Sequence, residues 1–303
     1  MPELPEVETV VRDLRNKLVG KKVLAVWTDW PKLIKDPLKQ SRLQVSWVTV
    51  RKFKKEIVGC TVERVERRAK NILIYLSGDL MMLVHQKMTG HFLVGRWLIK
   101  KDKIIPIYPD AMVNDSYNGY IHLLLTLSNG QMLALSDVRK FAKVLFGPRD
   151  VIKSLPELTR LGSDALDKKL TTGQFVGIVQ CETRPIKQVL MDPFVVAGIG
   201  NIYSDEILWQ AKVHPTMKAN NLTKTQLQII HKAMRQILTK AVKLRGTSTS
   251  DFRDTDGRKG GYTRHRLVYG RKGEPCSRCK SPIERMVIGG RGTHFCGKCQ
   301  KTD

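Results

Sequence analysis

The first residues of the chain could perform chemistry that no residue inside a chain can. Removal of Met1 would leave Pro2 with a free secondary amine, which can attack an aldehyde-type carbon and form an iminium ion. Glu3 and Glu6 follow in what the pattern predicts to be the first turn of a helix. The positive end of that helix would disfavour protonation of a nearby amine and keep it nucleophilic. An ordinary acidic, proline-initiated helix start is the alternative interpretation.

A second group of reactive residues lies near the C-terminal end. Two C-x2-C pairs are separated by sixteen residues, a spacing typical of a four-thiolate zinc site: Cys276, Cys279, Cys296 and Cys299. Two disulfides are the alternative. The start of the chain does not resemble a secretory signal, and Cys60 and Cys181 stand alone, so we expect a reducing compartment. Four protein thiolates leave no coordination position for water, which favours a structural Zn²⁺.

Composition indicates the class of partner. The chain has 53 Lys plus Arg against 28 Asp plus Glu, a net charge of +25. The excess is spread along the sequence rather than gathered in one tail, which favours a polyanion such as nucleic acid. An anionic membrane surface is the weaker alternative, because no basic amphipathic helix with bulky apolar residues stands out, and no apolar stretch is long enough to span a bilayer.

The elements that must position these residues change in type along the chain. The first half contains short runs of β-type residues, and Asn129-Gly130 between two apolar runs predicts a hairpin. The second half is helical to about residue 246, with a capping box at Thr223 and Gln226. Residues 246–263 lack periodicity and are either a functional flap or disorder. The predicted strands are 23–27, 43–50, 71–76, 81–85, 121–127 and 131–135.

Several motifs, in the same order and over nearly the whole chain, resemble the formamidopyrimidine-DNA glycosylase family. These are the N-terminal stretch 2–9, the basic run 67–70, the segments 185–187 and 198–203, and residues 289–296 before the last cysteine pair. The resemblance implies an α+β fold: an N-terminal β-sandwich flanked by helices, then a helix–two-turn–helix domain with a four-cysteine zinc finger. It predicts a catalytic domain at 1–147, a linker at 148–165, a DNA-binding domain at 166–266 that includes a lesion-capping loop at 246–263, and a zinc finger at 267–303.

The same resemblance implies a bifunctional enzyme of base excision repair, which excises oxidised purines such as formamidopyrimidines and 8-oxoguanine and then cleaves the strand. It assigns Pro2 as the nucleophile, Glu3 and Lys70 as proton donors, and Arg291 to the elimination step and to phosphate binding. Glu6 and Glu206 would support the pocket. Without the family, Lys70 reads as one more solvated cation and Glu206 as an exposed helix charge.

Reaching a base inside the duplex requires extruding it. The resemblance implies that Met88, Arg139 and Phe141 fill the gap, where the residues alone would place Met88 and Phe141 in the core. Asn201 is either the N-cap of a helix that starts near Ile202 or a direct phosphate ligand. Tyr120 is expected to contact DNA.

Some positions depart from the family pattern. Gln86 and Lys87 stand where Leu-Gly is usual, Tyr120 where many members have a histidine, and Glu182 where many have a lysine. Residues 27–60 look longer than usual. These departures bear on affinity and base-pair preference, but none removes the nucleophile or the finger.

The sequence therefore predicts a monomeric, cytoplasmic DNA glycosylase with lyase activity, which needs one structural Zn²⁺, binds double-stranded DNA containing oxidised bases and does not associate with membranes. Two other functions stay open at this stage. One is an endonuclease VIII-like enzyme that prefers oxidised pyrimidines. The other is a non-enzymatic zinc-finger DNA-binding protein with an inert N-terminus.

Overall fold

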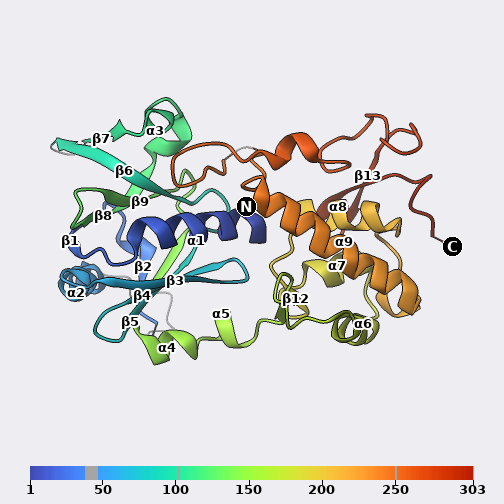
Figure 1. The fold of residues 1–303 in the computed structure, drawn as a ribbon, viewed down its shortest axis with the longest axis horizontal. Coiled ribbons are helices and arrows are strands. Elements are labelled where there is room, and N and C mark those ends of the chain that lie inside the picture. The colour runs from blue at the N-terminus through green and yellow to red at the C-terminus, as the bar shows by residue number, and fades with distance from the viewer. Residues whose placement is uncertain (38–46, 101–102, 250, 303) are drawn as a thin grey trace. The chain divides into compact units, whose positions relative to one another are not determined.

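The computed structural model describes residues 1–37, 47–100, 103–249 and 251–302. The chain forms two compact units, whose elements are labelled in Figure 1. Unit 1 comprises Met1–Thr159 and Arg245–Gly261, and unit 2 comprises Arg160–Leu244 and Tyr262–Asp303. None of the helices in the described ranges combines the length and apolarity needed to cross a bilayer.

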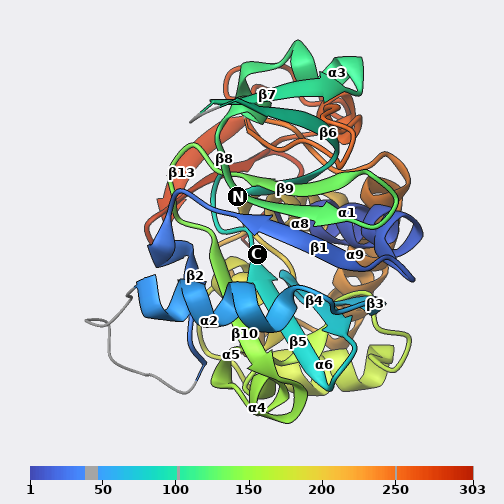
Figure 2. The same cartoon turned by 90° about the vertical axis from the view of Figure 1, so that its left-hand side faces the viewer.

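Unit 1 is built on two five-stranded sheets, which Figure 2 shows as separate layers. The first sheet has the order β1-β8-β9-β6-β7 and the second β2-β10-β5-β4-β3. All neighbours pair antiparallel except β2 and β10, which are parallel. The strands are β1 Val23–Trp27, β2 Ile34–Lys35, β3 Val62–Arg68, β4 Asn71–Leu76, β5 Leu80–His85, β6 His91–Lys100, β7 Lys103–Tyr108, β8 Ile121–Leu127, β9 Met132–Ser136 and β10 Lys143–Pro148.

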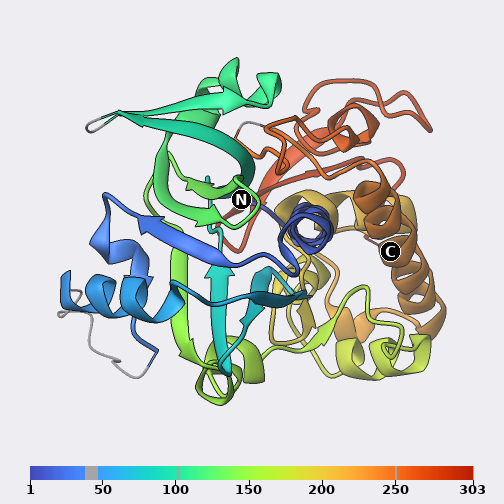
Figure 3. The same cartoon turned by 60° about the vertical axis from the view of Figure 1, so that its left-hand side comes forward.

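The inner faces of both sheets share one core with helix α1, which Figure 3 shows nearly end-on. Apolar side chains recur along α1 at helical spacing and are fully buried, as the period of 3.6 residues requires for one face of a helix. The helices and 3-10 turns of unit 1 are α1 Leu4–Leu18, η1 Pro31–Leu33, α2 Trp47–Ile57, α3 Asp110–Val113, η2 Ser116–Gly119, α4 Arg149–Lys153 and α5 Pro156–Thr159.

One predicted strand is wrong. Residues 43–46 of the expected strand at 43–50 lie outside the described residues, and the remainder begins helix α2. The run of β-branched residues favoured a strand locally. In the structure Val50, Phe53 and Ile57 form one buried face of a helix against the core, so tertiary packing overrides β-propensity. The hairpin predicted at Asn129-Gly130 is confirmed, since it joins β8 to β9 with Gly130 at φ +77°.

Unit 2 is helical, with two small sheets. Helix α9 begins after the predicted capping box, in which the Thr223 hydroxyl accepts a hydrogen bond from the Gln226 N–H at 3.1 Å. It packs against α6 and α8. The elements are β11 Ser163–Asp164, α6 Thr172–Gln180, α7 Ile186–Met191, β12 Val196–Ala197, α8 Asn201–Ala211, η3 Ala219–Asn221, α9 Lys224–Lys243, η4 Tyr262–His265, β13 Glu284–Ile288 and β14 Arg291–Phe295. The predicted α+β class, with a two-sheet N-terminal domain before helices and a C-terminal four-cysteine segment, is confirmed.

Segment 245–261 belongs to unit 1, although it follows helix α9 in the sequence. It is anchored by ion pairs rather than by regular structure. Arg245 pairs with Asp13 and Asp254, and Lys17 pairs with Asp256. Arg253, 2% exposed, pairs with Asp115 of the loop before η2. In its described part this segment is therefore packed against unit 1.

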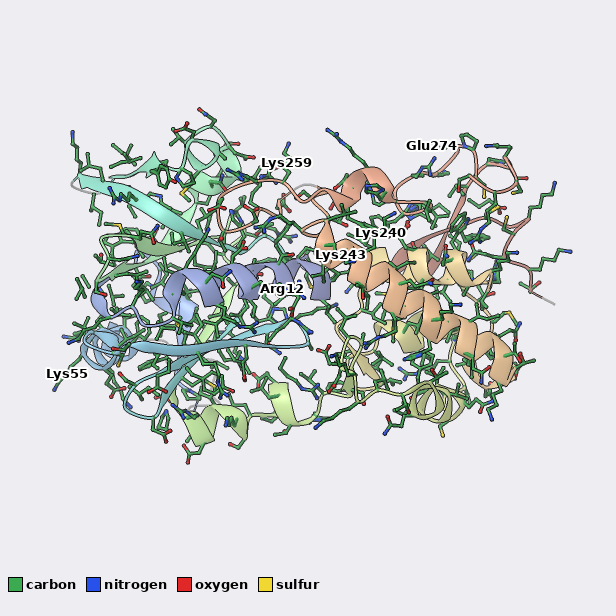
Figure 4. The ribbon with its side chains drawn as sticks, viewed as in Figure 1. Arg12, Lys55, Lys240, Lys243, Lys259 and Glu274 are labelled. Atoms are coloured by element: carbon green, nitrogen blue, oxygen red, sulfur yellow. The ribbon has the colours of Figure 1, made fainter. Side chains whose placement is uncertain are left out.

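Positive charge lies on many elements. Figure 4 marks Arg12 on α1, Lys55 on α2, Lys240 and Lys243 on α9, and Lys259 in the anchored segment. Both units carry cations on several elements, as the spread of basic residues along the sequence predicts. A positive charge distributed in this way suits an extended polyanion better than one basic tail does.

Candidate DNA-repair site and zinc centre

The first turn of α1 holds the candidate nucleophile. Pro2 is buried while Met1 before it is 51% exposed. Glu3 is the N-cap of α1 and forms a capping box with Glu6, whose Oε2 accepts the Glu3 N–H at 2.8 Å. The backbone next to Pro2 is therefore fixed by a buried carboxylate three residues further along.

The register of α1 against β3 brings Pro2 toward Lys70. Arg15 donates to the Val65 carbonyl at 3.1 Å, and Arg67 donates to Glu8 at 2.8 Å, so α1 and β3 run in opposite directions. The start of α1 consequently lies at the end of β3 where the turn to β4 carries Lys70. Ala69 in this turn has φ +54°, and its carbonyl accepts from Arg67 at 3.0 Å. Lys70 is half-buried.

Glu6 also fixes the start of segment 245–261. Its Oε1 accepts the Thr247 N–H at 2.7 Å. At Gly246, φ is +81° and a Cβ would lie within 2.7 Å of the Glu6 carboxylate, so only glycine fits. One carboxylate therefore joins the N-terminus of α1 to segment 245–261.

The three predicted gap-filling side chains gather in unit 1. The Arg139 guanidinium lies 4.5 Å from the centre of the Phe141 ring and 3.5 Å from the Met88 sulfur. Met88 is 40% exposed and Phe141 49% exposed, so neither belongs to the core. Arg139 and Tyr120 are also exposed. A flexible thioether, a cation and a ring that are close together and open to solvent suit insertion between bases.

Sequence reasoning missed Asp137, which holds two loops of this group together. It is 1% exposed. Its Oδ1 accepts the Thr89 hydroxyl, and its Oδ2 accepts the N–H groups of Phe141 and Ala142, each at 2.7 Å. The signal available in the sequence was an aspartate just before a tight, polar turn, where Asp often bonds backbone N–H groups further along.

His85 stands at the end of β5, beside the Met88 loop. Burial, together with the positive charges of Lys87, Lys70 and Lys143, lowers the pKa of His85 to about 3. Its Nδ1 accepts the Lys87 N–H at 2.9 Å, which suits a neutral ring. At neutral pH this histidine is uncharged in the folded protein.

In unit 2, helix α8 and hairpin β13–β14 form a second candidate group. The N-cap of α8 is Gly200, so the N-cap interpretation of Asn201 is wrong; Asn201 is the first helical residue. Its side-chain N–H donates to the Gly292 carbonyl at 3.0 Å. Arg291 is the exposed first residue of β14, directly after the tight Gly289-Gly290 turn. Asn201 therefore fixes the backbone next to Arg291.

A buried ion pair beneath this hairpin was also missed. Lys187 and Asp205 are 1% and 0% exposed at the side chain, with Nζ and Oδ1 2.5 Å apart. The other oxygen of Asp205 accepts the His294 N–H of β14 at 2.8 Å. Lys187 lies inside one of the motifs that carried the resemblance, but nothing in the sequence identified its partner.

Glu206 is buried in α8 and holds the chain segment that leads to the zinc finger. It accepts three consecutive backbone N–H groups at 2.8–3.0 Å, those of Leu267, Val268 and Tyr269. Burial raises the pKa of Glu206, and these three hydrogen bonds oppose the rise. The exposed-charge alternative for Glu206 is therefore wrong.

The four cysteines converge at one point. Their sulfur atoms all lie within 4.8 Å of one another. The Cys276–Cys299 and Cys279–Cys296 sulfurs are 3.9 and 3.4 Å apart, far longer than a disulfide bond. A tetrahedral zinc site with Zn–S bonds of about 2.3 Å has S–S edges of roughly 3.8 Å, so the donor set fits Zn²⁺. The prediction of one structural zinc is confirmed over the disulfide alternative.

One of the departures from the family pattern, Glu182, has a local structural explanation. Glu182 pairs with Arg184, which also pairs with Asp192, so this acid serves a surface ion network. Of the longer segment 27–60, residues 38–46 lie outside the described ones. Cys60 is buried and Cys181 is exposed; both are free thiols.

The fold and the cysteine cluster define a zinc-finger protein with an N-terminal two-sheet unit and a helical module. Comparison with known proteins places it more closely. Residues 1–144 match the formamidopyrimidine-DNA glycosylase N-terminal domain, residues 161–253 the H2TH domain of that enzyme, and residues 273–302 a zinc finger found in FPG and IleRS.

Full-length similarity agrees. The chain is 36% identical over 302 residues to a formamidopyrimidine-DNA glycosylase of Bacillus licheniformis, which covers 99% of this chain and 100% of the relative. A Lactococcus lactis Fpg bound to DNA with an abasic site matches with TM-score 0.82 and 30% identity, over 99% of this chain and 100% of that one. MutM bound to DNA containing carbocyclic 8-oxo-G matches with TM-score 0.79 and 30% identity, over 99% and 100%. The chain belongs to the formamidopyrimidine-DNA glycosylase family.

Proposed function

We propose that Pro2 carries out the excision reaction of this chain, a bifunctional DNA glycosylase and AP lyase that removes oxidised purines in base excision repair. Once Met1 is removed, the Pro2 amine attacks C1′ of the damaged nucleotide and the base leaves with a proton. The ring opens and the sugar is held as an iminium ion on Pro2. The observation that carries this proposal is the burial of Pro2 at the strand end that bears Lys70.

Strand cleavage follows from the same intermediate. The positive iminium acidifies the C2′ hydrogen, so loss of that proton expels the 3′ phosphate by β-elimination. A second elimination expels the 5′ phosphate, and water then releases the sugar fragment from Pro2. Glu3 and Lys70 serve as proton donors at the sugar, and no redox cofactor is required because no step changes the oxidation state.

Arg291 and Asn201 are proposed to hold the DNA backbone. A guanidinium on a tight hairpin can bind a phosphate through two parallel hydrogen bonds. Asn201 fixes the Gly292 carbonyl and so positions that guanidinium. Because phosphate contacts carry most of the affinity, binding should fall steeply as salt rises. The relatives bound to abasic-site DNA and to 8-oxo-G DNA support damaged duplex DNA as the partner.

Met88, Arg139 and Phe141 are proposed to fill the gap that the extruded base leaves, with Arg139 paired to the orphaned base and Phe141 stacked beside it. Tyr120 is proposed to contact DNA nearby. Segment 246–263 is proposed to cap the extruded base, and the Glu6–Thr247 hydrogen bond would connect its start to the nucleophile. The protein is expected to act as a monomer in the bacterial cytoplasm.

Trapping with borohydride tests the nucleophile directly, since reduction turns the iminium into a permanent protein–DNA bond. We expect a covalent adduct with 8-oxoguanine duplex for the processed protein, and none for Pro2→Gly or for protein that keeps Met1. Pro5→Ala is the matched control, because Pro5 lies within the same turn but is not terminal. Trapping by a preparation in which mass spectrometry finds Met1 throughout would contradict the proposal.

Substrate choice tests the preference for oxidised purines. A panel of duplexes should show faster excision of 8-oxoguanine and formamidopyrimidines than of oxidised pyrimidines. Faster excision of oxidised pyrimidines would contradict this preference.

A further inference from the structure

The side-chain amide of Gln86 is buried without hydrogen-bond partners. The residue is 1% exposed, and neither its Nε2 nor its Oε1 has a partner. Within the described ranges it is the side chain whose donor and acceptor are both unpaired. A buried amide that no protein group pairs costs free energy. The folded state therefore carries a local cost at a position that an apolar residue could fill without it.

The register of the second sheet sets Gln86 beside the proposed site. Strands β4 and β5 pair Ile72 with Val84 and Asn71 with His85. Gln86 directly follows the end of β5, and Lys70 directly precedes the start of β4. Since side chains alternate along a strand, Gln86 shares the face of Val84, which packs into the core that includes α1. The unpaired amide thus lies at the strand end toward which the start of α1 runs.

Gln86 also begins the loop that carries Met88. Its carbonyl accepts the Gly90 N–H at 3.1 Å, closing a tight turn. A Cβ on Gly90 would lie 2.5 Å from that carbonyl, so this turn needs glycine. Lys87 has φ +57°, a left-handed conformation that a lysine adopts only at a cost. Loop 86–90 therefore carries Met88 on a backbone with one locally unfavourable residue, and it begins at the residue whose buried amide is unpaired.

We propose that Gln86 is a positioning residue of the Met88 loop, which rests on the function proposed above. When Met88 enters the duplex, loop 86–90 rearranges and the Gln86 amide makes the hydrogen bonds that it lacks in the free protein. The free-energy cost of the unpaired Gln86 amide is therefore present in the free protein and absent from the complex in which a base is extruded. Since binding shifts an equilibrium by the difference in free energy between two states, Gln86 favours damaged over intact duplex.

Gln86→Leu and Gln86→Met test this inference, because both fill similar volume without a polar group. We expect each to raise the melting temperature of the free protein. Affinity for a duplex with a stable abasic-site analogue should fall about tenfold, and affinity for the undamaged duplex should stay unchanged. With abasic DNA as substrate, KM should rise while kcat at saturation is unchanged, since Gln86 acts through Met88 and not on the reacting atoms.

Trp97→Phe is the control variant. The indole N–H of Trp97 is also buried and unpaired, but it lies in the core of the first sheet on β6. Its removal should leave the ratio of damaged to undamaged affinity unchanged. A Gln86→Leu protein with the wild-type ratio, whatever its melting temperature, would overturn the inference. Failure of the proposed function looks different, since wild-type protein would then give no borohydride adduct at all.

Discussion

The first turn of α1 and the middle of α8 use the same device in two different units. In each, a buried helical glutamate accepts backbone N–H groups, at least one of which belongs to a segment distant in sequence. Glu6 binds Glu3 and Thr247, and Glu206 binds three consecutive residues that begin at Leu267. The difference is in position: Glu6 lies four residues from Pro2, whereas Glu206 organises the entry to the zinc finger.

The two units also assemble their sites differently. The four zinc ligands come from two short knuckles, so their spacing in the sequence already describes the centre. The candidate residues of unit 1 come from α1, from the turn between β3 and β4, and from loops after β5 and β9, and only the sheet register brings them together. The zinc centre therefore depends mainly on its metal. The candidate site of unit 1 depends on the buried hydrogen bonds that connect its elements.

Removing zinc should have the largest effect, and it should act on unit 2 without unfolding unit 1. Bound zinc contributes on the order of 10 kcal/mol to small metal-dependent domains. We expect a chelator, or Cys296→Ser, to unfold residues 273–302 and abolish DNA binding, while unit 1 keeps its structure. Limited proteolysis followed by mass spectrometry measures this. Continued protection of β13 and β14 after zinc loss would contradict the local nature of the site.

Replacing each glutamate by alanine should lower the free energy of unfolding by a different amount. Glu206→Ala removes the acceptor of three backbone N–H groups and should cost about 3 kcal/mol, because each lost hydrogen bond costs on the order of 1 kcal/mol. Glu6→Ala removes the acceptor of two backbone N–H groups and should cost about 2 kcal/mol. Urea unfolding measures both. Glu206→Gln and Glu6→Gln are the controls, since each keeps one acceptor.

The order of the two variants should be reversed for activity: Glu6→Ala should lose more activity than Glu206→Ala. At temperatures where both variants are folded, Glu6→Ala should lose borohydride trapping more than Glu206→Ala, because Glu6 fixes the backbone next to Pro2. Equal losses in trapping would indicate that both carboxylates act only on stability.

The sequence was most informative where function depends on spacing along the chain. The zinc knuckles, the start of α1 and the capping box at Thr223 follow from local patterns, and the family motifs implied the rest of the candidate site. The links that hold it in place could not be predicted, since Asp137, Lys187 and Asp205 act through partners distant in sequence. The segment at 47–50 was misassigned as strand because its β-branched residues do not reveal which face the core will bury.

Acid should destabilise unit 1 through His85. Its pKa is about 3 in the folded protein against 6.5 unperturbed, so between these values the unfolded chain binds the extra proton. Stability therefore rises with pH through this window, by at most about 1.4 kcal/mol per pH unit from this group. His85→Gln should flatten the dependence of melting temperature on pH between 4 and 6.5, roughly, and keep an acceptor for Lys87. An unchanged slope would mean that His85 can take up the proton within the fold.

The smallest expected effect compares two arginines on one carboxylate. Glu8 accepts from Arg12 and from Arg67, each at 2.8 Å, but the Arg12 side chain is 58% exposed and that of Arg67 is 10% exposed. Water screens the exposed pair, so Arg12→Ala should cost less than about 0.5 kcal/mol. Arg67→Ala should cost about 1–2 kcal/mol, because it also releases the Ala69 carbonyl in the turn before Lys70.

Trapping rates distinguish packing from positioning in this pair. Since Arg67 fixes the turn that presents Lys70, Arg67→Ala should slow adduct formation severalfold even when the protein is fully folded, whereas Arg12→Ala should leave it unchanged. Arg67→Lys keeps the charge but not the second hydrogen bond to the turn, so it should recover stability more fully than rate. Equal rates of adduct formation for all three variants would mean that the pairing of β3 with β4 alone positions Lys70.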